Sequence, residues 1–296
     1  MSFNDYSSYG FQFDRLANHL QDTNAQKKYY DKWMKKYSEV FKSEENLLIA
    51  MEWDLRCRKS LREIFFSATL YQEAKKNLEN RCFSSYYFCL YYSLFHAIYA
   101  CIFLDTECKA SQLLEVTHRN IIKLFISAYG NTSKDIMSHE VEVLFNNLKY
   151  RREYYSYVTP FNNLFNYVDD LSTLEPILLD CYQLAAMHSL FIDISYSKHV
   201  HFVQKMYSTD DMYAFDTLFN NFFSKRNSNE TPKLDPSSKF MRAEMIEFGF
   251  KPEYIALDLD HQYDEFHTYD GFYNDTKSET PISVTDIWSF VAQALL

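Results

Sequence analysis

Apolar residues recur at helical spacing along most of the chain. Within 11–50 and 50–80 they return every three or four positions, with charged side chains between them, which predicts amphipathic helices. Similar patterns predict further helices at 112–129, 135–158, 170–197, a short one beyond 239, and 284–295. We therefore expect an all-α protein.

Residues 82–104 contain no charged side chain, and this segment is long enough to be weighed as a membrane span. It also contains five Tyr, three Ser and one His, which are costly to place in hydrocarbon. A central helix buried on nearly all sides explains the same composition. We expect that buried helix, and no association with a membrane.

Glycine and proline are scarce, which excludes several function classes. The chain of 296 residues has four Gly, and all six Pro lie at or after Pro160. Four scattered Gly allow neither a GxGxxG fingerprint nor a Walker A loop, so dinucleotide-binding and P-loop folds are excluded. The near absence of breaks before residue 160 favours long helices.

Charge is distributed unevenly. The net charge is −10, but residues 253–296 alone carry nine acids and one Lys, whereas residues 56–155 have a net charge of +4. A mildly basic centre is compatible with nucleic acid, and the acidic end is suited to covering that centre or a basic partner.

The N-terminus has neither a basic region nor an apolar run, so we expect a cytoplasmic protein.

One acidic segment resembles a ligand set for a metal. Residues 258–267 contain four acids and two His, a density of ligands that suits Mg²⁺, Mn²⁺ or Zn²⁺. The segment has neither the Gly of an EF-hand nor HExxH spacing. We therefore expect a solvated acidic loop, with no metal and no cofactor.

The six Cys form no CxxC pair and are expected to be scattered reduced thiols.

Three short patterns occur in order in the centre of the chain. Residues 91–97 read YYSLFHA, 117–119 read THR, and 148–155 read LKYRREYY. Together with the apolar helix that follows, they resemble the HEPN superfamily, in the branch with a Tyr-Tyr-x-x-Phe-His-Ala helix, a Thr-His pair and an Arg-x-x-Ala-Asp-Tyr ending. Glu153 or Tyr154 stands where that ending has Ala or Asp. The resemblance covers about 60–195.

The resemblance implies an antiparallel helical bundle that is usually dimeric. Relatives of this kind occur in toxin–antitoxin modules, beside nucleotidyltransferase partners, and in anti-phage defence, and many active members are metal-independent RNases. We accordingly divide the chain into an N-terminal helical extension (1–55), a HEPN-like bundle (56–198) and a small C-terminal accessory region with the acidic loop (199–296). Within the last region, residues 227–238 read as a polar linker.

Active members of the superfamily carry Arg, four to six residues, and then His on one helix. None of the ten Arg in this chain has a His five to seven positions later. Three hypotheses stay open: a module that binds RNA, a nucleotide or a partner protein; a divergent endoribonuclease that uses His118 with Arg151 or Arg152; and a non-enzymatic oligomeric scaffold. A homodimer, and RNA or a nucleotidyltransferase as partner, are expected under the first.

The candidate residues follow from these patterns. His118, Arg151 and Arg152 are the candidates for catalysis, because imidazole exchanges protons and guanidinium stabilises charge on phosphorus. The candidates for contact with RNA or a nucleotide are Arg119, Tyr154, Tyr155 and His96, because guanidinium binds phosphate and aromatic rings stack on unpaired bases.

Each candidate also has a purely structural interpretation. His96 is explained equally by a hydrogen-bonded core position, and His118 by the start of a helix with Thr117 as N-cap. Arg151 and Arg152 are favourable near a helix C-terminus. The tyrosines at 154, 155 and 157 are explained by packing.

Overall fold

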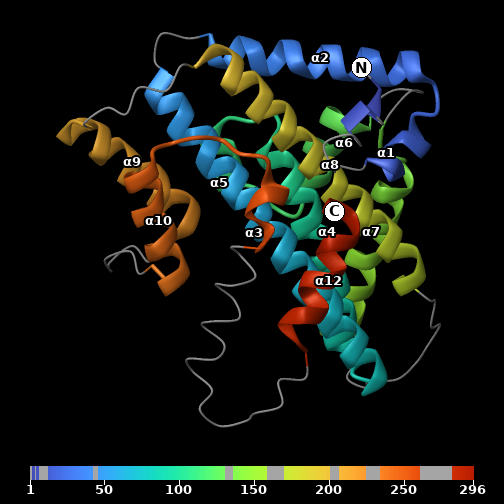
Figure 1. The fold of residues 1–296 in the computed structure, drawn as a ribbon. Helices are drawn as coiled ribbons and strands as arrows, with labels where there is room; N and C mark the ends of the chain where they lie inside the picture. Colours follow the sequence, from blue (N-terminus) through green and yellow to red (C-terminus); the bar gives the residue numbers. More distant parts are fainter. Residues whose placement is uncertain are drawn as a thin grey trace.

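The protein is all-helical in the part that the computed structural model describes, which is residues 2–3, 5–6, 13–42, 46–130, 136–158, 170–200, 207–224, 234–260 and 282–296. These residues form eleven α-helices, a π-helical turn and a short 3-10 helix, and no strand (Figure 1). The elements are α1 (Asp14–His19), α2 (Thr23–Phe41), α3 (Asn46–Glu79), α4 (Phe83–Phe103), α5 (Ala110–Leu114), α6 (Ile121–Tyr129), α7 (Glu140–Glu153), η2 (Tyr154–Val158), α8 (Asp170–His199), α9 (Thr209–Phe223), α10 (Pro236–Phe248), η3 (Ile255–Asp258) and α12 (Val284–Leu295).

The helices expected at 50–80, 82–104 and 170–197 correspond to α3, α4 and α8. The single helix expected at 112–129 is wrong, because a turn at 117–120 separates α5 from α6. In that turn the side-chain oxygen of Asn120 accepts a hydrogen bond from the Thr117 backbone N–H at 2.7 Å, so a local polar side chain competes with the helix. Thr117 is therefore not the N-cap of α6, which is Asn120.

Helix α9 is absent from the sequence-based expectation. Its signal was nevertheless present, because Ser208 and Asp211 form a capping box and the helix buries Phe215, Phe219 and Phe222 on one face. Helix α10 likewise begins at Pro236, inside the segment expected to be a linker.

Helices α3 and α4 form the antiparallel hairpin at the centre of the fold (Figure 1). They approach closely at a pair of serines, where the Ser67 hydroxyl donates to the Ser93 carbonyl at 2.7 Å and the Ser93 hydroxyl donates to the Ser67 carbonyl at 2.9 Å. The Tyr182 hydroxyl of α8 donates to the Ser67 hydroxyl at 2.7 Å. These three fully buried polar side chains therefore fix the register of the central helices.

The turn between α3 and α4 is built without glycine. Arg81 adopts φ of 56°, a left-handed conformation. The backbone N–H of Cys82 donates to the Asn77 carbonyl at 2.7 Å, and that of Arg81 donates to the Leu78 carbonyl at 3.0 Å. This is a Schellman ending, in which glycine is the usual residue, and it positions the first turn of α4 beside the last turns of α3.

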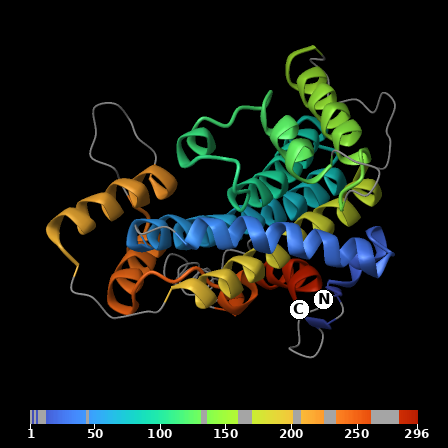
Figure 2. The same ribbon diagram turned by 90° about the horizontal axis from the view of Figure 1, so that it is seen from above.

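Helix α2 packs along α8, across the top of Figure 1 and the front of Figure 2. His188 of α8 is fully buried in this interface. Because the Tyr37 hydroxyl donates to the Leu104 carbonyl at 2.7 Å, it accepts from Nδ1–H of His188 at 2.8 Å. The other ring nitrogen, Nε2, then accepts from the Tyr29 hydroxyl at 2.7 Å. His188 is thus a neutral imidazole whose two nitrogens are both satisfied.

Acid is expected to weaken this interface. Burial, with smaller effects of Lys32 and Lys36, holds the pKa of His188 well below 6.5. Below pH 6.5 the unfolded chain therefore binds a proton that the folded protein does not, and the free energy of unfolding falls by about 1.4 kcal/mol per pH unit. Urea unfolding of the wild type and of His188→Gln between pH 7.5 and 5.5 measures this contribution.

The His188→Gln protein should lose less stability than the wild type over the same pH range, because Gln does not titrate. In both proteins His19 contributes a pH dependence of stability with the opposite sign. Its hydrogen bond with Asp180 raises its pKa, so this contribution increases the free energy of unfolding as the pH falls. Equal slopes in the two proteins would contradict the assignment.

Both ends of the chain contribute to the central core. Phe290 of α12 stacks on Tyr71 of α3 with ring centroids 4.6 Å apart, and meets Tyr182 of α8 edge-on at 5.9 Å. Helices α9 and α10 lie beside the start of α3, on the left of Figures 1 and 2.

Helix α3 runs without interruption through residues 55 and 56, where the sequence placed a domain boundary. That division stays a prediction.

Among the described helices, α4 and α8 have the length and apolar composition of a membrane span. In the most apolar window of each, 78% and 89% of the residues are buried inside the protein. Packing against neighbouring helices therefore accounts for their composition.

Candidate functional site

His118 lies in the turn before α6 and is held between two tyrosines of α4. Its Nδ1 is 2.9 Å from the Tyr91 hydroxyl, and its Nε2 is 3.4 Å from the Tyr92 hydroxyl. The rings of both tyrosines are 5.5 Å from the imidazole, centroid to centroid. The turn that interrupts the expected helix therefore brings His118 onto α4.

Arg152 of α7 reaches the same tyrosines. Its Nη1 donates to the Tyr92 hydroxyl at 3.3 Å, and its guanidinium carbon lies 4.6 Å from the centre of the Tyr91 ring. Stacking on an aromatic face keeps the charge of a guanidinium while shielding it from water. His118 and Arg152 thus share one site, joined through Tyr92.

The donors and acceptors of this cluster can be assigned. Because Arg152 donates to the Tyr92 oxygen, the Tyr92 hydroxyl hydrogen is available to Nε2 of His118, and Nδ1–H then donates to Tyr91. Burial, and then the positive charges of Arg152 and Lys149, lower the pKa of His118. His118 is therefore neutral at neutral pH, and accepts a proton rather than contributing a positive charge.

Arg151 serves a different role from its neighbour. It forms an ion pair with the buried Asp170 of α8 at 2.5 Å and donates to the Tyr87 hydroxyl at 3.2 Å. Tyr155 is buried and stacks on Tyr87, with centroids 4.8 Å apart. The expectation that Tyr155 contacts RNA disagrees with this burial, because its ring is already covered. Arg151 and Tyr155 therefore make structural contacts with α8 and α4.

Three other side chains, which are neighbours of this cluster in the chain, face solvent. Arg119 is exposed, as are Tyr150 and Tyr157, whose exposed fractions are 68% and 80%. The half-buried Tyr154 lies between them and stacks on Tyr150 with centroids 6.3 Å apart. We name Tyr92, His118, Arg119, Tyr150, Arg152, Tyr154 and Tyr157 together the α4–α7 face.

Tyr150 was missed as a candidate, and Tyr157 was interpreted only as packing. A signal was present in their spacing, because positions 150, 154 and 157 share one side of a helix, turned away from the buried Leu144 and Leu148. A π-helical turn, η2, carries Tyr154 and Tyr157 at the end of α7. Such turns are frequent at functional sites.

His96 lies one turn along α4 from Tyr92 and belongs partly to the core. Its Nδ1 is 2.5 Å from the carboxylate of the buried Glu63, which Lys59 also contacts at 2.7 Å. Burial alone would raise the pKa of Glu63, but Lys59 and His96 outweigh it and lower that pKa. Phe95 separates His96 from His118, contacting both rings. His96 therefore borders the site, where its ring contacts Tyr92 with centroids 6.4 Å apart.

The acidic segment at 258–267 lies mostly outside the described residues. Of its acids, Asp258 is 4.0 Å from Arg58 and forms part of a buried ionic cluster. Within the described part of the chain, no group of three or more His, Cys, Asp or Glu is arranged to hold a metal ion.

Comparison with known protein families, with curated proteins and with solved structures finds no match to this chain.

Proposed function

We propose that the protein binds single-stranded RNA on the α4–α7 face, as a HEPN-like antiparallel bundle of a prokaryotic toxin–antitoxin or anti-phage defence system. The observation that carries the proposal is the row His118–Tyr92–Arg152, with Arg119 exposed next to His118 in the chain and the rings of Tyr150 and Tyr157 exposed on α7 and η2. The three local sequence patterns that resemble the superfamily lie on or beside this face.

The chemistry of the face suits an unpaired strand. Exposed tyrosine rings stack on bases of any identity, whereas a duplex hides its bases from them. Arg119 supplies a guanidinium for phosphate, and Lys149 lies near enough to His118 to lower its pKa. A protein that binds in this way prefers single strands and weakens with added salt.

Removal of the exposed rings tests the proposal. We expect the double variant Tyr150→Ala/Tyr157→Ala to bind labelled single-stranded RNA of mixed sequence at least about thirtyfold more weakly, because two stacked bases are lost and each contributes about 1–3 kcal/mol. Fluorescence anisotropy measures the affinity, and thermal unfolding checks that stability is unchanged.

The matched control is Tyr213→Ala, because Tyr213 is an equally exposed tyrosine at 76% and lies on α9. Its affinity for RNA should equal that of the wild type. The proposal fails if the wild type binds no RNA, or if the double variant binds as tightly as the control.

The hydrogen-bonded cluster also favours endoribonuclease activity as a second candidate. Once the 2′-hydroxyl of a ribose displaces the Tyr92 hydroxyl from Nε2, a neutral His118 can accept its proton as that oxygen bonds to the adjacent phosphorus. The P–O5′ bond breaks, the 5′-oxygen takes a proton from water, and Arg152 can stabilise the charge that develops on the phosphate. Products would carry 2′,3′-cyclic phosphate ends and would disappear in His118→Ala. Intact RNA, or products that persist in the variant, would contradict this candidate and leave binding as the function.

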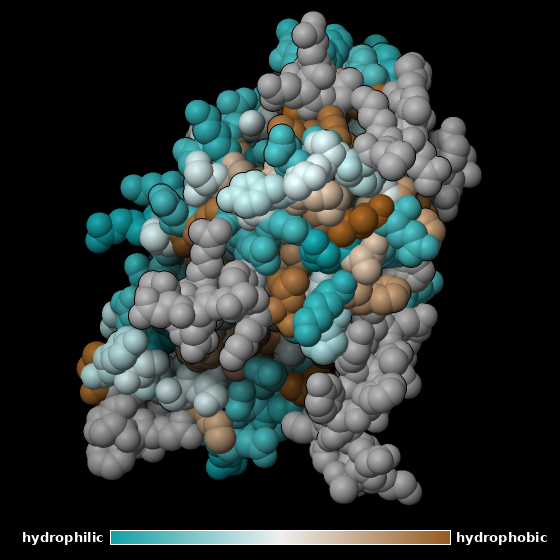
Figure 3. Space-filling view, turned by 90° about the vertical axis from the view of Figure 1, so that its left-hand side faces the viewer, coloured by the Kyte–Doolittle hydropathy of each residue, from teal (hydrophilic) through white to brown (hydrophobic). Residues whose placement is uncertain are grey.

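The scaffold hypothesis receives no support from the face drawn in Figure 3. Among the residues drawn in colour, hydrophobic side chains there are separated by hydrophilic ones and form no continuous apolar surface. The homodimer and the nucleotidyltransferase partner stay predictions from the resemblance.

A further inference from the structure

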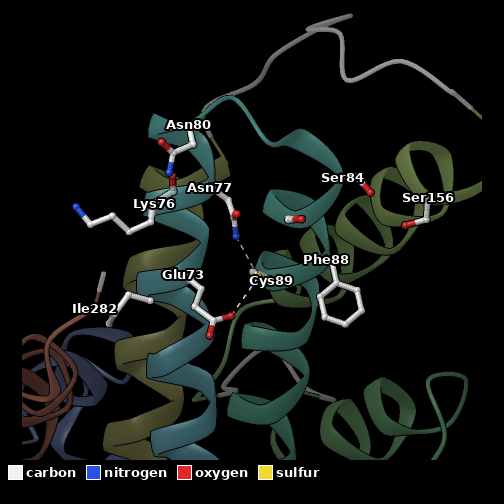
Figure 4. Close-up of a pocket in the computed structure, with 10 residues that line it drawn as sticks. Glu73, Lys76, Asn77, Asn80, Ser84, Phe88, Cys89, Ser156 and Ile282 are labelled. Atoms are coloured by element: carbon white, nitrogen blue, oxygen red, sulfur yellow. Dashed lines mark hydrogen bonds between the residues drawn. The ribbon is translucent and has the colours of Figure 1, made fainter. Parts of the chain in front are cut away.

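A groove lies where the end of α3 meets the beginning of α4, next to the α4–α7 face (Figure 4). Its volume is about 610 Å³, within the range of about 300–1,000 Å³ that is usual for small-molecule sites. Seven of the ten residues that line it are polar: Glu73, Lys76, Asn77, Asn80, Ser84, Ser85 and Ser156. The others are Phe88, Cys89 and Ile282.

One wall of the groove presents oriented acceptors. The buried Cys89 thiol donates to Glu73 Oε2 at 3.6 Å and accepts from the Asn77 amide nitrogen at 3.6 Å, as the dashed lines in Figure 4 show. Burial, together with Glu73, raises the pKa of Cys89 to about 12, so the thiol keeps its proton and this arrangement persists. Within the described residues no side-chain hydrogen bond reaches Glu73 Oε1 or Asn77 Oδ1, so both can accept from a ligand.

The carboxylate of Glu73 has no cation of its own. Among the described residues no Lys, Arg or His forms an ion pair with it, and the nearby Lys76 pairs instead with Glu79 at 3.0 Å. A partly buried carboxylate without a basic partner favours a ligand that donates hydrogen bonds to it.

The opposite end of the groove favours an anion. Ser84 and Ser85 lie in the first turn of α4, a helix of 21 residues whose N-terminus has no side-chain cap. Their hydroxyl and backbone N–H groups suit phosphate oxygens. Figure 4 shows Ser84 facing Ser156 of η2 across this end.

An aromatic ring joins the groove to the site already described. Phe88 is 47% exposed, and its centroid is 4.5 Å from that of Tyr92, which contacts both His118 and Arg152. Phe88 is one helical turn, about 6 Å, from Ser84. Figure 4 shows Glu73 and Asn77 on one side of Cys89 and the Phe88 ring on the other, and all of them line the groove together with the serines one turn away.

We propose that this groove is a guanosine subsite, which selects a guanine base of the bound strand. N1–H and the exocyclic amine of guanine donate to Glu73, the ring rests on Phe88, and the attached phosphate lies against Ser84 and Ser85. Adenine presents an acceptor where guanine presents N1–H, so it is rejected by the carboxylate. The subsite rests on the proposed function, because it specifies which base the α4–α7 face holds.

Labelled oligouridine strands with one central G, A or inosine test the subsite by fluorescence anisotropy. We expect the strand with G to bind about tenfold more tightly than the strand with A, and inosine, which lacks the exocyclic amine, to fall between them. Glu73→Gln, which keeps the shape of the side chain, should remove the preference and leave the affinity for the strand with A unchanged. The control Glu79→Gln, on the same helix outside the groove, should retain it.

Competition with free GMP and AMP separates a strand from a free nucleotide as the ligand. If RNA binds without preference for G, or if Glu73→Gln retains the preference, the subsite is wrong and the RNA-binding function stands. If no RNA binds but GMP binds more tightly than AMP and depends on Glu73, the subsite holds for a free nucleotide and the proposed function fails. If neither RNA nor GMP binds, both are wrong.

Discussion

Replacement of Trp33 with alanine is expected to lower the free energy of unfolding by about 3–5 kcal/mol, as for other large buried aromatic residues. Trp33 is fully buried among four aromatic neighbours, of which Tyr29 is the most distant at 6.2 Å. Its ring stacks on Tyr37 at 5.8 Å and on Tyr129 at 5.5 Å, and His188 meets it edge-on at 4.5 Å. Its loss opens a cavity where α2, α6 and α8 meet. Urea unfolding measures the change.

Two variants make this result specific. Tyr213→Ala removes a ring that is mostly exposed and should change stability by less than about 0.5 kcal/mol. Trp33→Phe should lose much less than alanine, because it retains a stacked ring and leaves a smaller cavity. A loss below 1 kcal/mol for alanine, on the order of a typical single substitution, would contradict the central role of Trp33.

The sequence was sufficient to predict the long helices but not their neighbours. Helices α3, α4 and α8 follow from continuous apolar patterns and from the absence of Gly, which are local properties. The contacts of Trp33 with Tyr129 and His188 join segments about a hundred residues or more apart, and no local pattern specifies such pairs. The break at 117–120 depends on one Asn120 side chain, which is too small a signal to outweigh the apolar pattern around it.

The candidate site shows the same limit. The sequence named His118, Arg151 and Arg152 together, but successive residues on a helix point about 100° apart, so the two arginines face different partners. Arg152 reaches Tyr91 and Tyr92, whereas Arg151 reaches Asp170. Which arginine would join His118 depended on the rotation of α7 against α4, which is a tertiary property. The groove between α3 and α4 could not be predicted either, because its lining comes from α3, α4 and η2 together.

The replacement Arg58→Ala is expected to lower the free energy of unfolding by about 3–5 kcal/mol, because it leaves a buried acid without its cation. Arg58 is mostly buried where α3, α10 and η3 meet, and it serves three carboxylates. It contacts Asp54 at 3.0 Å, Glu244 at 3.2 Å and Asp258 at 4.0 Å. Arg242→Ala is the matched control, because its pair with Asp216 is half exposed and should contribute less than about 1 kcal/mol.

The pH dependence of this loss distinguishes an unpaired charge from lost packing. Burial raises the pKa of Asp54 to about 6 even though Arg58 and the Lys251 backbone N–H oppose the shift. Between the ordinary value of 3.8 and that pKa, the folded state binds more protons than the unfolded chain, so the cost of the Asp54 charge grows as the pH rises. Without Arg58 the pKa of Asp54 rises further. The difference in the free energy of unfolding between wild type and Arg58→Ala should therefore be largest at neutral pH and smaller towards pH 4. It should also be smaller when both proteins carry Asp54→Asn. A loss that is constant with pH would mean that Arg58 acts through packing alone.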